Sequence, residues 1–288
     1  MTGDVAGGWP VKDAVWAAVV DDAATERKLK EDFLDYRGMV PMGVGGVVPQ
    51  EHFERFGGVL PGSLLYAWRR FGFEGFSGGR FWITDPVVWE PVVEAWLDGI
   101  RGRLPFQDRW WCITRSAFGK MQMWGEQSGT SLMISPVYGL IYPEDLRADW
   151  DDLVVRERMG RIVFSTPVQD FEDDEGVEPA PAAIERLGPL APGEVFGFVP
   201  PRSVTGRVLV GEATVQEAVP YLCWLAGVQD RVVMPDLISA NRGLIDRIAA
   251  ELLPGEEPGS VAGSGSESSS GGVSGSGGLA DAEGGGPR

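Results

Sequence analysis

The stretch RWWCITRSAFGKMQMWGEQSGTSLMISPVYGLIY, Arg109–Tyr142, decides the fold. It contains four runs of strand composition, RWWCITR, KMQMW, TSLMIS and VYGLIY, and the polar turn GEQSG separates the second run from the third. Short apolar runs joined by glycine-bearing turns are typical of neighbouring antiparallel strands. The stretch therefore predicts an antiparallel meander, with Arg115 and Lys120 as exposed positive charges beside its first turn.

The residues before the meander predict helices around one hairpin. Aromatic residues stand on both sides of Ser77-Gly78-Gly79 in FEGFSGGRFWI, which is a strong hairpin signal. LPGSLLYAWRRFG has a helical apolar face and a glycine stop at Gly72. TDPVVWEPVVEAWLDG offers Asp85 as a helix N-cap with Pro86 in the first turn. Residues 11–36 also have helical composition.

The residues after the meander predict further helices and one strand. A helix is expected within residues 144–159, a short helix in PAAIERLG that ends at Gly188, and a strand in GEVFGFVPP. TVQEAVPYLCWLAG opens with Thr214 and Glu217 in the spacing of a capping box, and Pro220 must kink or delimit that helix. PDLISANRGLIDRIAAELL predicts a last amphipathic helix.

These elements predict an α+β fold with four parts. An N-terminal helical extension covers residues 1–38, and a helical unit with a β-hairpin covers residues 39–108. An antiparallel sheet packed with helices follows over residues 109–253. Residues 254–288 are rich in glycine and serine and poor in apolar side chains, so we expect a disordered C-terminal tail.

The charge balance restricts the classes of partner. The chain has 42 acidic and 25 basic residues and a formal net charge of -17. Such a surface repels nucleic-acid phosphates and anionic membranes, so we expect neither as a partner. A basic protein is attracted to it and steered toward it. Solubility alone is the alternative explanation of the acidity.

Acidic residues concentrate in the run QDFEDDEGVEPAP, around Phe171. A solvated loop is one interpretation of this run, because like charges repel and extend a segment. An acidic patch that docks onto lysine and arginine side chains of a partner is the other. The run lacks the spacing of an EF-hand calcium loop. The candidate partner-binding residues are Asp170, Glu172, Asp173, Asp174 and Glu175.

Side chains that catalysis commonly uses are scarce. The one histidine, His52, has no accompanying nucleophile motif such as G-x-S-x-G, so we expect a helix-surface position or a satisfied hydrogen bond. Cys112 and Cys223 lie in apolar runs, where burial raises the pKa of a thiol. The glycine-rich PMGVGGVVP does not fit a P-loop and predicts a mobile loop. We predict a protein that is not an enzyme, without a metal or cofactor, although a hidden acid/base pair of carboxylates stays open.

Two features bear on the compartment. The N-terminus lacks a basic region followed by an apolar one, and no stretch approaches the roughly 18 apolar residues of a transmembrane helix. The two cysteines are far apart in sequence and lie in apolar runs, which is typical of buried thiols in a reducing compartment. We expect a cytoplasmic protein.

The order of the motifs adds a resemblance. VPQEHFERFGGVLPGSLLYAWRRFGFEGFSGGRFWITDPVVWEPVVEAWL resembles the GAD-like domain, which corresponds to residues 39–108. ITRSAFGKMQMWG, VYGLIY, RLGPLAPGEVFGFVPP and VQEAVPYLCWLAG look like the domain of unknown function that commonly follows it. Proteins with this pairing are similar to immunity proteins that bind the nuclease domain of type VI secretion DNase effectors. The resemblance implies a non-catalytic immunity protein whose partner is a cognate toxin with a basic nuclease domain.

Two other functions stay open. The first is a small-ligand-binding or regulatory module without a toxin partner, which uses an aromatic-lined pocket around Trp82, Trp89 and Trp124. The second is a hydrolase that relies on the abundant carboxylates. Ligand-induced thermal shifts distinguish the first from an immunity protein, and loss of a measured activity on mutation identifies the second.

Overall fold

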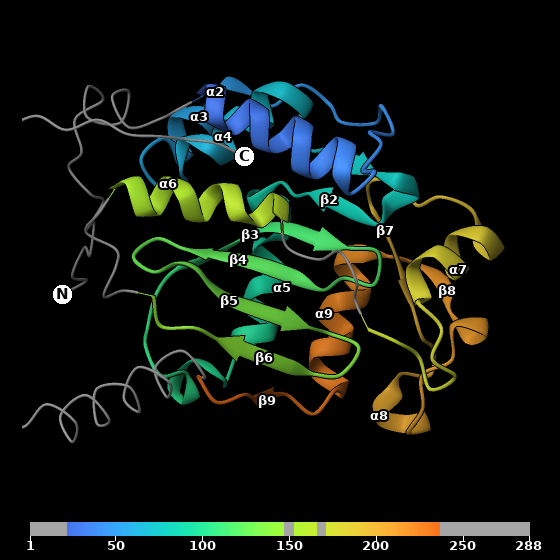
Figure 1. Ribbon diagram of the computed structural model, residues 1–288. Helices are drawn as coiled ribbons and strands as arrows, with labels where there is room; N and C mark the ends of the chain where they lie inside the picture. The colour runs from blue at the N-terminus through green and yellow to red at the C-terminus, as the bar shows by residue number, and fades with distance from the viewer. Residues whose placement is uncertain (1–21, 147–152, 166–170, 237–288) are drawn as a thin grey trace, which may run out of the picture. The chain divides into compact units, whose positions relative to one another are not determined.

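A seven-stranded sheet packed with helices organises the chain, as the α+β prediction expects (Figure 1). The computed structural model describes residues 22–146, 153–165 and 171–236. All of these residues belong to one unit, Met1–Ile245. In the sheet, the strand order is β1-β2-β3-β4-β5-β6-β9, and every pairing is antiparallel except the parallel pair β6 and β9.

The central strands form the predicted meander. The strands of this sheet are β1 (Gly75–Phe76), β2 (Phe81–Ile83), β3 (Trp110–Ser116), β4 (Met121–Gly125), β5 (Gly129–Ser135), β6 (Leu140–Pro143) and β9 (Val232–Val233). The hairpin expected at Ser77-Gly78-Gly79 joins β1 to β2, and positive φ angles at all three residues make the turn. β2 also pairs with β3, so the sheet is continuous across residue 109. The expected boundary between the unit of residues 39–108 and the unit of residues 109–253 stays a prediction.

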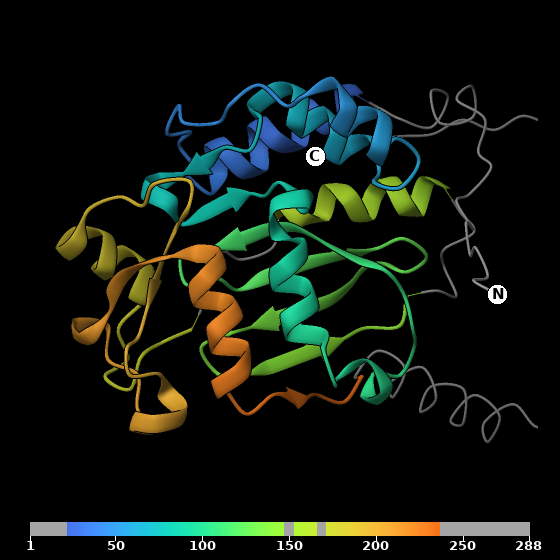
Figure 2. The ribbon, with the colours of Figure 1, turned by 180° about the vertical axis from the view of Figure 1, so that it is seen from behind.

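Two helices cover one face of the sheet. α5 (Pro86–Leu97) and α9 (Ala218–Val228) lie side by side on the face seen in Figure 2. Asp85 caps α5 as predicted, because its carboxylate accepts the N–H of Val87 at 2.9 Å. Trp96 of α5 is fully buried and its Nε1 donates to the carbonyl of Leu222 at 3.1 Å, which fixes the two helices together.

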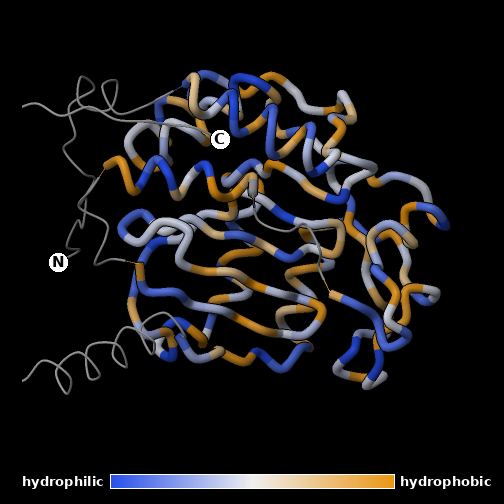
Figure 3. Tube along the Cα trace, in the orientation of Figure 1, coloured by the Kyte–Doolittle hydropathy of each residue, from blue (hydrophilic) through white to orange (hydrophobic). Residues whose placement is uncertain are grey.

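A second group of helices shares a core cluster with strands β1 to β4. It consists of α2 (Asp22–Arg27), the π-helical η1 (Lys28–Tyr36), α3 (Gln50–Phe56), α4 (Gly62–Phe71) and α6 (Leu153–Ile162), and α6 also contacts β5. Along α2 and η1, hydrophobic and hydrophilic stretches alternate in Figure 3, as expected for a helix with one buried side. Glu157 of α6 is buried, and its carboxylate accepts the first two backbone N–H groups of α4, those of Gly62 and Ser63. This contact satisfies the N-terminus of α4.

The glycine-rich loop between η1 and α3, expected to be mobile, is held by one buried carboxylate. Glu74 accepts hydrogen bonds from the N–H groups of Val44 and Gly45, each at 3.1 Å, and from that of Gly75 at 2.9 Å. Gly45 also lies too close to α4 for a side chain, since a Cβ there would be 2.3 Å from the carbonyl oxygen of Phe71. The glycines therefore permit a close approach of the loop to α4.

The third part of the fold follows the meander in sequence. It contains η5 (Val163–Ser165), α7 (Pro179–Leu187), β7 (Glu194–Gly197), α8 (Arg202–Thr205), η6 (Val210–Glu212) and β8 (Thr214–Glu217), while the remaining short turns are η2 (Ser77–Gly79) and η3 (Arg101–Arg103). The predicted capping box is wrong, because Thr214–Glu217 is a strand that pairs with β7. Pro220 is expected either to kink the helix or to delimit it. It delimits the helix, because it lies in the first turn of α9.

Other expectations have mixed outcomes. α4 ends at Gly72 and α7 at Gly188, both with positive φ, as predicted. The expected helix in 144–159 is α6, which runs further toward the C-terminus. The last amphipathic helix, the C-terminal tail and residues 11–21 lie outside the described residues. Within the described ranges, no helix has the length and apolar character to cross a membrane.

Candidate functional site

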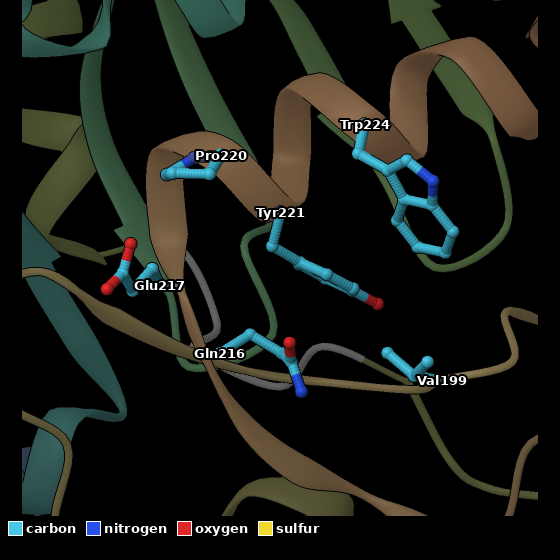
Figure 4. Close-up of a pocket in the computed structure, with 6 residues that line it drawn as sticks. All are labelled: Val199, Gln216, Glu217, Pro220, Tyr221 and Trp224. Carbon is cyan, nitrogen blue, oxygen red and sulfur yellow. The ribbon is translucent and has the colours of Figure 1, made fainter.

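An open groove lies between the start of α9 and the β7–β8 pair (Figure 4). Its volume is about 420 Å³. The lining residues are Val199, Gln216, Glu217, Pro220, Tyr221 and Trp224. Figure 4 places Tyr221 between Gln216 and Trp224, with Val199 near its hydroxyl end. The groove therefore presents apolar and aromatic side chains with polar groups at one end.

The position of Tyr221 is set by backbone contacts on β7. Its hydroxyl accepts a hydrogen bond from the N–H of Phe198 at 2.9 Å and donates to the Phe198 carbonyl at 3.2 Å. Its ring lies over Gly197, where a Cβ would be 2.4 Å from Cζ of Tyr221. Burial raises the pKa of Tyr221, and the hydrogen bond from Phe198 opposes this rise only in part. The phenol therefore remains a hydrogen-bond donor at neutral pH.

Two large apolar side chains at the groove face solvent. Trp224 is 43 % exposed and Val199 is 57 % exposed. The rings of Tyr221 and Trp224 are 5.8 Å apart, so the exposed indole rests on a buried and fixed neighbour. Exposed tryptophans on rigid elements are frequent anchors of protein interfaces.

The predicted acidic loop is linked to the groove through the buried residue Phe198. Asp170 lies outside the described residues, while Glu172, Asp174 and Glu175 are exposed. Phe171 contacts the ring of Phe198 at a centroid distance of 6.5 Å. Because Phe198 also holds Tyr221, the acidic loop and the groove share Phe198 as a common neighbour. The structure thus leaves three of the predicted carboxylates exposed on a loop that packs on the same core as an apolar groove that the sequence did not indicate.

Asp173 has a different position from the rest of the run. It is only 5 % exposed, and its carboxylate accepts the N–H groups of Glu175, Val177 and Val210, each at 2.9 Å. Burial raises the pKa of Asp173, but the three hydrogen bonds outweigh it and hold the pKa below its ordinary value. This carboxylate is engaged within the chain and gives the loop its shape.

Asp174 is exposed and also forms hydrogen bonds that hold the loop in place. Its carboxylate accepts the N–H of Val208 at 2.9 Å, and its own N–H donates to the Val208 carbonyl at 2.9 Å. Glu178, at the end of the run, forms an ion pair of 2.6 Å with Arg80. Most carboxylates of the run are exposed on a loop, so the solvated-loop interpretation and the docking interpretation both stay open, while backbone donors hold part of the loop in one conformation.

The expectation that Arg115 is an exposed positive charge is wrong. Arg115 is 2 % exposed and its guanidinium lies over the rings of Trp82 and Trp89, at 4.6 and 5.4 Å. It donates to the carbonyls of Ser116 and Pro192. Arg115 is thus a buried cation that joins β3 to the segment before β7. Lys120 is half-buried.

The aromatic pocket expected around Trp82, Trp89 and Trp124 is also wrong. The three side chains are 2 %, 5 % and 0 % exposed and belong to three different core clusters. The exposed aromatic groove is instead formed around Trp224. The apolar stretch YLCWL in the sequence could not reveal this, because α9 is apolar on nearly all sides and its periodicity selects no buried face.

His52 forms a hydrogen bond through its Nε2, which is one of the two non-catalytic roles that the sequence predicts. Its Nε2 lies 3.1 and 3.2 Å from the two carboxylate oxygens of Asp85, the N-cap of α5. Phe56, Trp68 and Phe73 surround the imidazole. The pair links α3 to α5 and lies in the helical layer, on different elements from those that form the groove.

The cysteines are free thiols, and burial raises the pKa of each, as predicted. The pKa of Cys112 rises to about 12. In the part of the chain that is described, no cluster of three or more histidine, cysteine, aspartate or glutamate side chains could hold a metal ion.

Comparison with known proteins supports the first module of the expected pairing. Residues 29–138 match the family model described as the GAD-like domain, which reaches from η1 through β5. The fold is similar to the crystal structure of Atu4351 from Agrobacterium tumefaciens, with a TM-score of 0.54 and 19% sequence identity. That similarity covers 70% of this chain and 90% of the other, and at this identity it establishes the fold alone. No curated protein matches the chain.

Proposed function

We propose that this chain is a non-catalytic immunity protein that binds a cognate secreted toxin, a type VI DNase effector, and occludes its basic nucleic-acid-binding site. The observations that carry the proposal are the exposed groove of Trp224, Tyr221 and Val199 and the exposed carboxylates of Glu172 and Glu175 on the acidic loop. The GAD-like match and the resemblance of the later motifs also support it.

The groove and the loop supply complementary parts of a protein interface. Protein interfaces combine a desolvated centre, where aromatic residues dominate the binding energy, with a polar rim. Trp224 and Tyr221 have the properties of the centre. Trp224 is exposed, and the buried Tyr221 packs against its ring. Glu172, Asp174 and Glu175 have the properties of an acidic rim. A toxin surface that binds DNA phosphates offers lysine and arginine side chains to such carboxylates.

The overall charge adds long-range attraction. With a formal net charge of -17, the chain accelerates association with a cationic surface at low ionic strength. Charge steers many cationic proteins equally, so specificity must come from the shape and chemistry of the groove. The proposal therefore requires that binding of the toxin depend on both the groove and the acidic loop.

The direct test purifies the proteins that the neighbouring genes encode and measures DNA cleavage by each while the full chain is titrated into the reaction. The proposal expects cleavage to stop at an equimolar ratio. A Trp224→Ala variant keeps the charge of the chain and should require a large excess. Poly-glutamate of matched charge controls for simple competition with DNA. Undiminished cleavage at an equimolar ratio, with no complex formed, would overturn the proposal.

The groove also gives the small-ligand alternative a concrete location. A cavity of about 420 Å³ lies within the size range of small-molecule sites. The groove is broadly open to solvent, which favours an extended protein segment over an enclosed ligand. A thermal shift with metabolites, abolished by Trp224→Ala in the absence of any bound protein, would favour the small-ligand function.

A further inference from the structure

Strand β8 has one edge that is not paired within the described parts of the chain. Its other edge pairs with β7 over four residue pairs, from Glu194↔Glu217 to Gly197↔Thr214. Thr214, Val215 and Glu217 are exposed, and Gln216 is half-buried. Exposed strand edges bind other chains readily, because their backbone donors and acceptors have no partners.

Two hydrogen bonds determine which backbone groups face this edge. The N–H of Ala218 donates to the carbonyl of Gly193, so residues 214 and 216 bond to β7 in the alternating antiparallel pattern. The N–H of Phe196 donates to Ala117, on the other side of β7, which agrees with this pattern. Val215 and Glu217 therefore direct their N–H groups away from β7, and Val215 also directs its carbonyl outward.

The groove lies on one face of the same strand. Gln216 lines the groove, and an added strand on the edge of β8 would alternate its side chains between the two faces of the sheet. Side chains on the face of Gln216 are directed toward Tyr221 and Trp224. Side chains on the other face lie beside Val215. A large apolar residue fits the first set of positions.

Electrostatics favours a basic residue at the Glu217 end of the edge. Glu194 and Glu217 stand directly opposite each other at the end of the β7–β8 ladder. Two like charges in this relation destabilise a strand pair. A lysine or arginine beside Glu217 relieves that repulsion and is attracted by the net negative charge of the chain. The edge is thus complementary to a basic strand.

We propose that an extended segment of the toxin, in which basic residues alternate with large apolar residues, binds as an added strand on the free edge of β8 and inserts an apolar side chain into the groove at Trp224. This inference rests on the proposed function and specifies the mode of binding. Backbone hydrogen bonds to Val215 and Glu217 supply affinity, and the groove supplies selectivity.

The test uses two blocked synthetic peptides and the full chain. One peptide alternates lysine with phenylalanine and leucine, and the control peptide has glutamate in place of each lysine. Amide exchange measured by NMR should slow at Val215 and Glu217 when the lysine peptide is added, by about tenfold or more. The glutamate peptide should leave both amides unchanged. The amide of Val47, which is 98 % exposed and precedes α3, provides an internal reference.

A backbone substitution tests the same hydrogen bonds. Val215→Pro removes an N–H that points away from β7, so it leaves the β7–β8 ladder intact, and proline is tolerated on edge strands. It should weaken binding of the lysine peptide and of the catalytically inactive toxin about tenfold, while Val215→Thr leaves binding within about twofold. The thermal unfolding midpoint of both variants controls for misfolding. The exchange experiment on the wild-type chain decides the question if Val215→Pro does not fold.

The possible outcomes separate the two proposals. If the toxin binds the wild-type chain but neither amide is protected and Val215→Pro binds equally well, strand addition is overturned and the proposed function stands. Protection of Val215 and Glu217 in the chain alone means that another part of this chain or a second copy covers the edge, which also overturns strand addition. If the inactive toxin does not bind the wild-type chain, the proposed function fails, and this inference fails with it.

Discussion

The hydroxyl of Tyr221 forms two hydrogen bonds to the backbone of Phe198, one through the N–H at 2.9 Å and one through the carbonyl at 3.2 Å. This relationship fixes the first turns of α9 to the end of β7. Phe198 in turn contacts Phe171 of the acidic loop. Phe198 thus contacts both Tyr221 of the groove and Phe171 of the acidic loop.

Replacing Tyr221 by phenylalanine should destabilise the fold. The substitution leaves a buried N–H and a buried carbonyl of Phe198 without their partner, which costs about 1–3 kcal/mol of unfolding free energy. Urea denaturation measures the difference. Tyr36→Phe is the matched control, because Tyr36 is 84 % exposed and its loss of a hydroxyl should have little effect. Equal stability of both variants would contradict the role assigned to Tyr221.

Replacing Trp224 by alanine should affect binding more than folding. Since the side chain is 43 % exposed, the unfolding free energy should fall by only about 1 kcal/mol. Affinity for the partner should fall at least about tenfold if Trp224 is an interface anchor. Calorimetric titration and denaturation measure the two effects separately.

Trp96 provides the matched control for Trp224. It is fully buried and donates a hydrogen bond to the carbonyl of Leu222, so Trp96→Ala should lose about 3–5 kcal/mol of stability. A Trp224→Ala variant that is as unstable as Trp96→Ala would assign Trp224 to the core. Unchanged affinity would remove it from the interface.

Asp173 should make the stability of the loop depend on acidic pH. Because its pKa is held below the ordinary value, the unfolded chain takes up this proton first as pH falls. The stabilising contribution is fully present above the unfolded pKa of about 3.9 and is lost as pH falls through the folded pKa. Asp173→Asn should therefore be less stable than wild type at pH 7, and the difference should shrink toward pH 3.

Glu175→Gln serves as the control for Asp173→Asn. Glu175 is exposed and belongs to the same loop, so its neutralisation should leave the stability difference close to zero at every pH. Unfolding free energies at pH 7, 5 and 3 provide the comparison. A difference for Asp173→Asn that stays constant down to pH 3 would show that its charge has no part in the effect.

Cys112 should resist alkylation in the folded protein. It is completely buried, and its thiol pKa of about 12 leaves very little thiolate at pH 8. Iodoacetamide followed by mass spectrometry should modify Cys112 only after denaturation. A Cys223→Ser variant isolates the signal of Cys112. Rapid labelling of that variant under native conditions would contradict the buried position of β3.

The elements that local sequence predicts are those whose signals act over a few residues. Asp85 caps α5, and glycine permits the positive φ that ends α4 at Gly72. The hairpin at Ser77-Gly78-Gly79 has the same local cause. Short-range turn and cap chemistry therefore predicted the meander, its neighbouring helices and the α+β class.

The incorrect predictions involve residues whose environment comes from distant parts of the chain. Thr214–Glu217 has the pattern of a helix start, but pairing with β7 makes it a strand. Arg115 looks exposed in sequence and is buried by Trp82 and Trp89. Tertiary contacts outweighed the local preference in both cases.

The candidate site was predicted only in part for the same reason. The sequence identified the acidic run, and the structure leaves Glu172 and Glu175 exposed while the backbone N–H of Val210 helps to bury Asp173. The groove depends on Gly197 and Phe198 lying under Tyr221, a contact that joins residues more than 20 positions apart. No local pattern encodes it.

The rate of association with the catalytically inactive toxin, measured by stopped flow over a series of salt concentrations, tests the central claim most directly. The double variant Glu172→Lys and Glu175→Lys reverses two exposed charges on the acidic loop. Glu31→Lys with Glu54→Lys makes the same change at exposed positions of η1 and α3. The account predicts slower association and a weaker salt dependence, with the larger loss for the loop variant. Equal rates for the two variants, or rates equal to wild type, would contradict it.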